Sequence, residues 1–163
     1  MQANSVICDT TVWLYLGRIG HLTLLQQLYN HVYVTEAVCL ELDTGRLQRA
    51  DTVDPRPFNW ATTVLATQQM LAQLPPSRLG RGELSSIAYA LAHQIDIVGL
   101  DDRQARALAK SLNLNIRGTI GILIQAKQAG LISAIRPLLH QLRQNGMYIA
   151  PSLLQAATAS VGE

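Results

Sequence analysis

Several of the acidic side chains in this chain follow segments that predict β-strands. Asp9 comes directly after residues 5–8, and the pair Asp101 and Asp102 follows the apolar residues 96–100. The carboxyl ends of parallel strands meet at one edge of an open α/β sheet, which is where such sheets bind ligands. We therefore expect these carboxylates to lie close together.

Two glutamates are expected at the same edge. Glu41 lies on the helix that follows the second predicted strand, and Glu83 lies in the first turn of the helix that leads to residues 96–100. Carboxylates gathered at one edge repel one another, and a hard divalent cation that prefers oxygen ligands offsets this repulsion. The pattern predicts a site for Mg²⁺ or Mn²⁺ formed by Asp9, Glu41, Glu83, Asp101 and Asp102.

The elements that must position these acids alternate between strands and helices. Predicted strands cover residues 5–8, 31–34, 60–65, 96–100, 114–116 and 147–149. Predicted helices cover residues 10–16, 21–29, 36–42, 66–74, 81–94, 103–111, 119–128 and 133–144, and a helical turn begins at Pro151. Residues 43–59 predict a loop with one helical turn around Leu47. This alternation, without an internal repeat, favours an α/β fold in which helices cover both faces of a parallel sheet.

Length and composition limit the classes of protein that fit. The chain has 163 residues, 48% hydrophobic and 15% charged, which suits a single domain over residues 1–163 and excludes a disordered chain. No apolar run approaches the ~18 residues of a membrane span and no signal peptide is evident, so we expect a soluble cytoplasmic protein without a membrane partner. Cys8 and Cys39 lack zinc-ligand spacing, and we expect two buried thiols.

Arginine side chains are the expected partners of phosphate groups. The net charge is only +2, but 11 of the 13 cationic side chains are Arg, the better bidentate phosphate binder. Arg103 and Arg106 either bind substrate phosphates or neutralise nearby carboxylates. Thr10 either donates its hydroxyl to a metal site or phosphate, or stabilises the turn after Asp9. Five loop arginines either form a track for RNA or are merely solvated: Arg46, Arg49, Arg56, Arg78 and Arg81.

Each acid also has a structural interpretation. Asp9 and Asp102 could cap the helices that follow them, Glu83 could stabilise a first turn through the helix dipole, and Glu41 could face solvent. Because these acids recur at one expected edge, we favour a role in the site for all four. Glu36, in contrast, is assigned to helix stabilisation.

Four segments, in order along the chain, resemble the PIN-domain nucleases, in particular a prokaryotic branch of small PIN proteins. VICDTTVWLYLGRIGHLTLLQQLY resembles its first strand, Asp turn and helix, and VTEAVCLEL its second acidic motif. LGRGELSSIAYALA resembles its Gly-Glu helix start, and VGLDDRQARALAKSLNLNIRGTIGILIQAKQAGLI its Asp-Asp-x-x-Ala-Arg helix with the Gly-Thr-x-Gly segment behind it. The motifs fall within residues 5–132, and residues 133–163 form a C-terminal extension.

The resemblance implies a three-layer α/β/α sandwich with a central, mainly parallel sheet and metal-dependent RNA endonuclease activity. It assigns catalytic roles to Asp9, Glu41, Glu83 and Asp102, with Asp101 as a further metal-binding acid. Leu100 stands where the family often has Thr or Ser, so whether Asp101 or Asp102 faces the metal stays open.

The resemblance also implies partners. RNA is the expected substrate, a small antitoxin protein the expected partner if the chain is the toxin of a toxin–antitoxin pair, and a homodimer the expected assembly, which the apolar residues 119–139 also favour. The alternative is a PIN-like RNA- or protein-binding regulatory protein with weak or no catalysis. A phospho-acceptor enzyme is disfavoured, because the dehalogenase pattern needs an acid where Thr11 stands.

Overall fold

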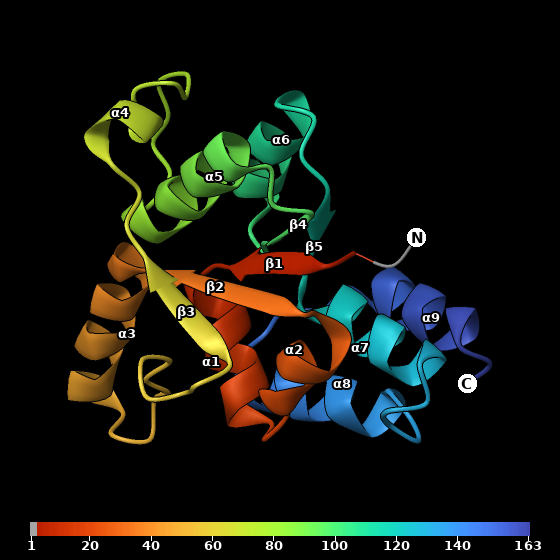
Figure 1. Ribbon diagram of the computed structural model, residues 1–163. Coiled ribbons are helices and arrows are strands. Elements are labelled where there is room, and N and C mark those ends of the chain that lie inside the picture. Colours follow the sequence, from red (N-terminus) through yellow and green to blue (C-terminus); the bar gives the residue numbers. More distant parts are fainter. Residues whose placement is uncertain (1–2) are drawn as a thin grey trace.

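The computed structural model describes residues 3–163 as strands that alternate with helices (Figure 1). The strands are β1 (Ser5–Cys8), β2 (His31–Thr35), β3 (Ala61–Val64), β4 (Ile97–Gly99) and β5 (Ile116–Arg117). The helices are α1 (Thr10–Arg18), α2 (Thr23–Leu28), α3 (Glu36–Gln48), α4 (Gln68–Leu71), α5 (Arg81–His93), α6 (Arg103–Ser111), α7 (Thr119–Gln128), α8 (Arg136–Gln144) and α9 (Pro151–Ser160).

The strands of residues 3–163 form one five-stranded sheet in the order β3-β2-β1-β4-β5, and all neighbouring pairs are parallel. The chain runs outward from β1 to β3 on one side and then crosses back to β4 on the other. The strand order therefore reverses between β1 and β4, where Cys8 pairs with Gly99. In open α/β sheets the ligand crevice lies outside the carboxyl ends of the strands at such a reversal.

Alternating side chains of the strands build a core on each face of the sheet. Val6 and Cys8 belong to a core with α1, α2, α7 and α8, whereas Ile7 belongs to a second core with α5 and α6. Figure 1 shows α5 and α6 on one side of the sheet and α1, α2, α7, α8 and α9 on the other. The expected three-layer α/β/α sandwich is confirmed.

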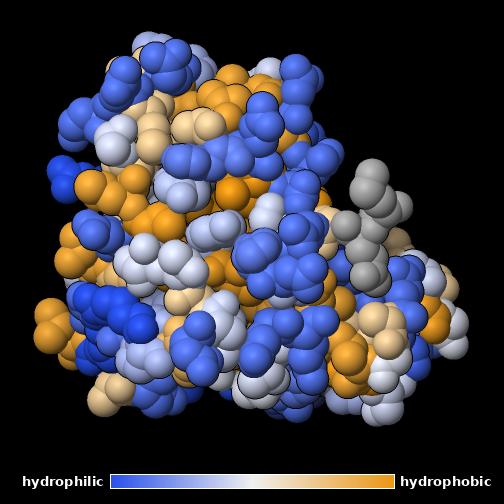
Figure 2. Space-filling view, in the orientation of Figure 1, coloured by the Kyte–Doolittle hydropathy of each residue, from blue (hydrophilic) through white to orange (hydrophobic). Residues whose placement is uncertain are grey.

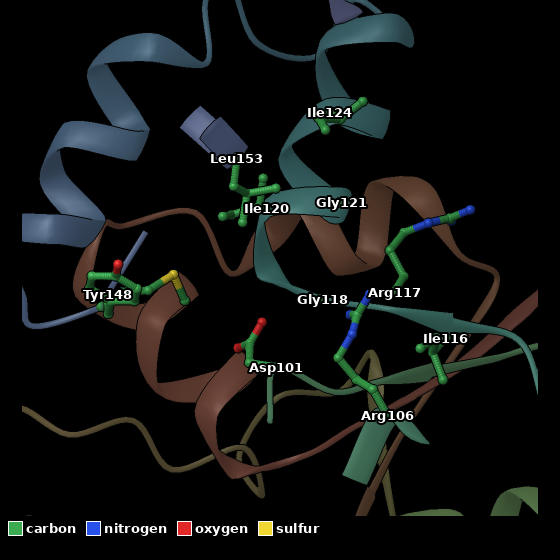
Figure 3. A pocket seen from close by; sticks show the side chains of 11 residues that line it. Asp101, Arg106, Ile116, Arg117, Gly118, Ile120, Gly121, Ile124, Tyr148 and Leu153 are labelled. Atoms are coloured by element: carbon green, nitrogen blue, oxygen red, sulfur yellow. The ribbon is translucent and has the colours of Figure 1, made fainter. Parts of the chain in front are cut away.

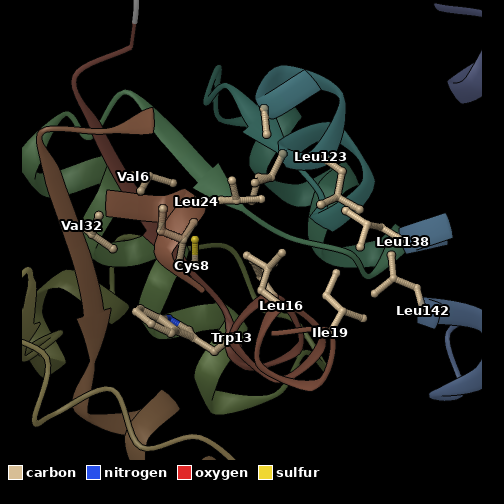
Figure 4. Close-up of a cluster of buried hydrophobic side chains, with 14 of the residues drawn as sticks. Val6, Cys8, Trp13, Leu16, Ile19, Leu24, Val32, Leu123, Leu138 and Leu142 are labelled. Atoms are coloured by element: carbon tan, nitrogen blue, oxygen red, sulfur yellow. The ribbon is translucent and has the colours of Figure 1, made fainter. Parts of the chain in front are cut away.

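The larger core uses the apolar residues of the C-terminal half. Figure 4 shows Leu123 and Leu138 facing Leu16 and Ile19 of the first helical unit. Leu123 and Leu139 have no exposed surface, and Leu138 is 7% exposed. Most apolar side chains of residues 119–139 thus pack in the core, although Leu131 is 38% exposed and Ile120 and Ile124 line a surface cavity. The homodimer stays a prediction.

Most element boundaries agree with the sequence, and α6 and α7 agree residue for residue. The loop predicted to begin at residue 43 is wrong at its start, because α3 continues to Gln48 with an Asp43–Arg46 ion pair along its surface. The strand predicted at residues 147–149 does not form. Its side chains alternate between solvent and core as in a strand, since Tyr148 is exposed and Ile149 is buried. The segment nevertheless pairs with no strand of the described sheet.

The expectation for the two cysteines is also met by the described residues. Cys8 and Cys39 are both free and buried, and burial raises the pKa of each thiol. No helix between residues 3 and 163 is long and apolar enough to cross a membrane.

Candidate active site

Asp9 is the most buried acid of the described chain and lies where β1 ends. Its backbone N–H donates to the carbonyl of Gly99 at 2.9 Å, which extends the pairing of β1 with β4 by one residue. The side chain is only 2% exposed, and its Oδ1 has no hydrogen-bond partner among the described residues. Although Asp9 has the backbone conformation of an N-cap, its side chain makes no capping hydrogen bond. Helix capping therefore does not explain this carboxylate.

The electrostatics of Asp9 follow from this burial. Loss of hydration raises its pKa to about 7, and the negative charges of Glu83, Glu41 and Asp101 act in the same direction. The backbone amide of Thr10 opposes the shift. A buried carboxylate surrounded by other acids is therefore a group that gains from a positive charge nearby.

Glu41, on the second turn of α3, is held beside Asp9 by two donors. The hydroxyl of Thr10 donates to Oε2 of Glu41 at 2.5 Å, and the backbone N–H of Gly82 donates to Oε1 at 2.8 Å. These bonds join α1, α3 and α5 at the carboxylate. The solvated-helix interpretation of Glu41 is therefore wrong, because its carboxylate is engaged by two other helices.

Gly82 lets the first turn of α5 approach this pair of acids. A Cβ atom at this position would lie 2.5 Å from Oε2 of Glu41 and 2.9 Å from Oδ1 of Asp9. Ser85 and Ser86 are buried and donate to the Gly82 carbonyl at 2.9 and 2.8 Å, and Ser85 also bonds the buried Thr35 hydroxyl. This network fixes the turn that presents the Gly82 N–H to Glu41.

The oxygen atoms at this edge are of the type that a hard divalent cation prefers. Asp9 Oδ1, Glu41 Oε2 and Thr10 Oγ1 all lie within 2.9 Å of the point where a Cβ on Gly82 would stand, so these three oxygens lie beside one another next to Gly82. Between residues 3 and 163, no three His, Cys, Asp or Glu side chains form a group placed to hold one ion. Mg²⁺ keeps several of its waters and uses one or two protein carboxylates, so the Asp9–Glu41 pair is a sufficient protein contribution.

Glu83 lies next to the pair but is directed at its own helix. Its Oε2 accepts the backbone N–H of Gly80 at 3.2 Å, which matches the expected first-turn role. Partial burial, followed by the charges of Asp102 and Glu41, raises the pKa of Glu83. The structure therefore places Glu83 within the negative field of the site, with its hydrogen bond made to backbone.

Asp101 is engaged by the N-terminus of α7. Thr119 donates both its backbone N–H to Oδ1 and its hydroxyl to Oδ2, each at 2.7 Å, and Thr119 is fully buried. A carboxylate at a helix N-terminus is stabilised by the helix dipole and the free N–H groups. Gly118 makes this approach possible, because a Cβ there would lie 2.9 Å from Oδ1 of Asp101.

Asp102 caps α6. Its Oδ2 accepts the backbone N–H of Ala105 at 2.9 Å, so the capping interpretation describes the contact that this side chain makes. Of the five acids predicted for the site, the structure thus brings together Asp9 and Glu41. The carboxylates of Glu83, Asp101 and Asp102 instead accept hydrogen bonds at the N-termini of α5, α7 and α6.

Cationic side chains on α6 border these acids. Arg103, Arg106 and Lys110 line a concavity of about 340 Å³ that also reaches Asp101. Arg106 donates to the Leu100 carbonyl at 3.0 Å, and none of the three forms an ion pair within residues 3–163. These cations are therefore available to an anionic ligand.

The loop arginines behave differently. Arg46 and Arg56 pair with Asp43, Arg56 also pairs with Asp54 at 2.8 Å, and Arg49 pairs with Asp51 at 2.7 Å. The predicted arginine track is therefore neutralised over these three positions.

A second cavity, of about 480 Å³, opens on the other side of Asp101 and Arg106 (Figure 3). Its walls come from β5, α7, α9 and the segment before α9, and include Ile120, Tyr148 and Leu153. A third concavity, of about 380 Å³, lies between α3, α4 and α5 and contains Leu40 and Leu65. Figure 2 shows hydrophobic side chains at the surface on that side of the molecule. Within the described chain, the exposed apolar surface gathers mainly in these last two places.

Sequence reasoning missed the residues that position the acids. Gly82 and Thr119 make the contacts that hold Glu41 and Asp101, although both were visible only as helix-start residues. The available signal was a Gly or Thr at the beginning of a helix that leads to or follows an acid-bearing strand.

Comparison with protein families gives a match over nearly the whole chain. A family model described as a PIN domain matches residues 5–163, which includes the segment from residue 133 onward. No curated protein matches the chain.

Proposed function

The chain belongs to the PIN-domain family, and from this premise we propose that it is a metal-dependent RNA endonuclease that hydrolyses phosphodiester bonds at the edge formed by Asp9 and Glu41. PIN domains are generally nucleases that use divalent metals, which agrees with the carboxylates at this edge. The catalytic set that we propose is Asp9, Glu41, Glu83 and Asp102, with Asp101 as an additional acid.

The observation that carries the proposal is the buried carboxylate of Asp9. Its Oδ1 has no hydrogen-bond partner in the described chain, and Glu41 lies beside it. An unsatisfied buried acid lowers the stability of a protein, because neither water nor a donor compensates its charge. Such a group is expected where a ligand completes the site.

The chain's own residues have distinct parts in this proposal. Asp9 and Glu41 would hold the cation, while Thr10 and the Gly82 N–H keep Glu41 turned toward Asp9. Glu83 and Asp102 add negative charge around the pair. When bound, a divalent cation activates water for attack on phosphorus and stabilises the negative charge that develops on the phosphodiester.

Substrate binding is assigned to the cations on α6. Arg103 and Arg106 contribute charge on the side of Asp101 that faces this helix, and Lys110 extends the row by one turn. In this proposal they would bind backbone phosphates of the RNA beside Asp101 while the acids act on the reacting phosphate. Thr10 is a further group that could contact this phosphate.

The test is cleavage of a pool of single-stranded and structured RNA by purified protein with Mg²⁺ or Mn²⁺. We expect cleavage that a chelator and the substitution Asp9→Asn each abolish. Asp51→Asn is the matched control, because Asp51 is an exposed acid paired with Arg49. Cleavage that survives both the chelator and Asp9→Asn would overturn the proposal.

A regulatory protein that binds RNA without turnover is the second candidate. It is favoured by one observation: Glu83, Asp101 and Asp102 are all engaged in hydrogen bonds at helix N-termini. This candidate predicts RNA binding that Asp9→Asn leaves unchanged, together with no metal-dependent cleavage. The toxin role, the small antitoxin partner and the homodimer rest on the family resemblance and stay predictions.

A further inference from the structure

The cavity of about 480 Å³ beside Asp101 combines an apolar wall with a charged edge. Ile116, Ile120 and Ile124 contribute hydrocarbon surface from β5 and α7. Arg106 and Arg117 lie on the side nearer the sheet, and in Figure 3 Asp101 lies between Arg106 and Tyr148. A flat ligand with an apolar face and a polar edge matches such a site better than a phosphate or an aliphatic chain does.

Arg117 lies at the end of this cavity nearer the sheet, and its guanidinium is held by two groups outside the cavity. Its Nη1 donates to the hydroxyl of the buried Tyr29 at 2.9 Å and to Oε1 of Gln125 at 2.5 Å. The guanidinium carries further N–H donors on Nε and Nη2. In Figure 3 this guanidinium points away from Asp101 and Tyr148, so Arg106 and the Asp101 carboxylate are the polar groups on the side of a bound base.

Tyr148 is the exposed aromatic side chain of this cavity. It lies in the segment between α8 and α9 and is 85% exposed, whereas its neighbour Ile149 is 4% exposed and anchors the segment to the core. The fold therefore fixes the backbone of this segment while leaving the ring in water. Aromatic rings displayed in this way provide stacking surfaces for the bases of single-stranded nucleic acids.

The two concavities meet at Asp101 and Arg106. Arg103 and Lys110 belong to the basic concavity, and Tyr148 belongs to the mixed one. A nucleotide has the same division, because its phosphate is anionic and its base is flat and largely apolar on its faces. The charges on the α6 side and the ring on the α9 side thus match in kind the phosphates and the bases of a nucleic acid that passes Asp101 and Arg106.

We propose that the cavity between α7 and Tyr148 binds one unpaired base of a single-stranded RNA, with Tyr148 stacked on the base while the cations of α6 bind the adjoining phosphates. This inference rests on the proposed function for the identity of the substrate. It makes Tyr148 a residue that selects single-stranded over paired RNA, because a base within a duplex cannot enter the cavity.

The test compares binding of one fluorescent RNA strand, alone and as a duplex, by anisotropy in the presence of a chelator. The variants are Tyr148→Ala, Tyr148→Phe and, as a control, Leu47→Ala, which truncates a side chain on α3 that is 87% exposed. We expect Tyr148→Ala to weaken single-strand binding about 5- to 100-fold. Tyr148→Phe keeps the ring and should bind as wild type does, as should Leu47→Ala, and Tyr148→Ala should leave duplex binding unchanged.

The outcomes separate this inference from the nuclease proposal. Equal single-strand affinity of wild type and Tyr148→Ala, or an equal loss for single strand and duplex, would overturn the base site even if Asp9-dependent cleavage is observed. A loss confined to the single strand supports the base site even if no variant cleaves RNA. In that case the regulatory candidate replaces the nuclease.

Discussion

Two pairs of acids lie at the reversal of strand order, and they differ in whether helix N-termini donate hydrogen bonds to their carboxylates. Asp101 and Asp102 follow β4, and their carboxylates accept hydrogen bonds from the first turns of α7 and α6. Asp9 and Glu41 come from the β1 and β2 units, and the buried Oδ1 of Asp9 has no partner within residues 3–163. The first pair stabilises helices, and the second pair leaves negative charge uncompensated.

This difference teaches that acids which follow strands can have different surroundings within one edge of a sheet. Asp9 follows β1 and Asp101 follows β4, so their positions in the sequence relative to the strands are alike. Their surroundings differ in whether a helix presents its free N–H groups to the carboxylate. Asp9 occupies the capping position of α1 without making a capping bond, and this absence supports the proposal that its carboxylate binds a ligand.

The largest expected effect is on the stability of the metal-free protein. The pKa of Asp9 is raised from 3.8 to about 7, so its ionisation destabilises the fold as the pH rises from about 4 to 7. Asp9→Asn removes this ionisation and should raise the free energy of unfolding at pH 8 by up to about 4 kcal/mol. The measurement is urea unfolding of both proteins at several pH values in chelator.

Two observations extend this first test. The free energies of unfolding of wild type and Asp9→Asn should become equal near pH 4. Mg²⁺ should raise the free energy of unfolding of wild type more than that of Asp9→Asn. If Asp9→Asn were less stable than wild type at pH 8 without metal, the uncompensated-charge interpretation would be wrong.

The second prediction concerns the glycine that approaches the Asp9–Glu41 pair. Gly82→Ala places a Cβ 2.5 Å from Oε2 of Glu41 and should displace this carboxylate, with cleavage falling about 10- to 100-fold. Gly80→Ala is the matched control on the same turn, because its nearest contact to a Cβ is 3.8 Å. Equal activities of the two variants would show that the close approach has no part in catalysis.

The third prediction applies the same substitution to the other pair. Asp101→Asn removes the charge at the N-terminus of α7 and weakens the two bonds from Thr119, so the free energy of unfolding should fall by about 1 kcal/mol. At pH 8 in chelator, Asp101→Asn should lower the free energy of unfolding, whereas Asp9→Asn should raise it. A gain for both would remove the distinction between the two pairs.

The smallest expected effect tests the cations beside Asp101 and Asp102. Arg103→Ala should weaken RNA binding a few-fold for all sequences. The slope of log affinity against log salt concentration should fall by about the amount expected for one lost phosphate contact. Arg49→Ala is the control, because Arg49 is already paired with Asp51. Salt titrations of RNA affinity give the measurement, and equal slopes for wild type and Arg103→Ala would exclude Arg103 from the phosphate contacts.

Much of the fold could be predicted because local signals agree with tertiary packing. Asp102 caps α6, as its place before residues 103–111 predicts, and α7 begins at Thr119, as the predicted helix over residues 119–128 does. The prediction failed where packing overrides local signals. Gly45 does not end α3, which continues past it to Gln48, and Tyr148 and Ile149 alternate in burial without an adjacent strand to pair with.

The site was predictable only to the level of which edge it occupies. The predicted strands placed Asp9 and Asp101 at one edge of the sheet, and the structure has them after the neighbouring strands β1 and β4. The bonds that divide the acids into two pairs link residues far apart in sequence, such as Gly82 with Glu41 and Thr119 with Asp101. Such contacts depend on how three helices pack at the edge, and residue spacing along one element does not contain that information.

The pairing of β1 with β4 also bears on how the protein is made. Cys8 pairs with Gly99, so the strand that completes the edge is synthesised long after the strand that carries Asp9. Chains emerge from the ribosome N-terminus first, and contacts between residues so distant in sequence form late and slowly. A nascent chain that has exposed only α1 to α3 holds both Asp9 and Glu41 without the wall that α5 supplies through Gly82. The two acids are therefore not yet held in their final arrangement while the chain is still attached to the ribosome, which consists largely of RNA.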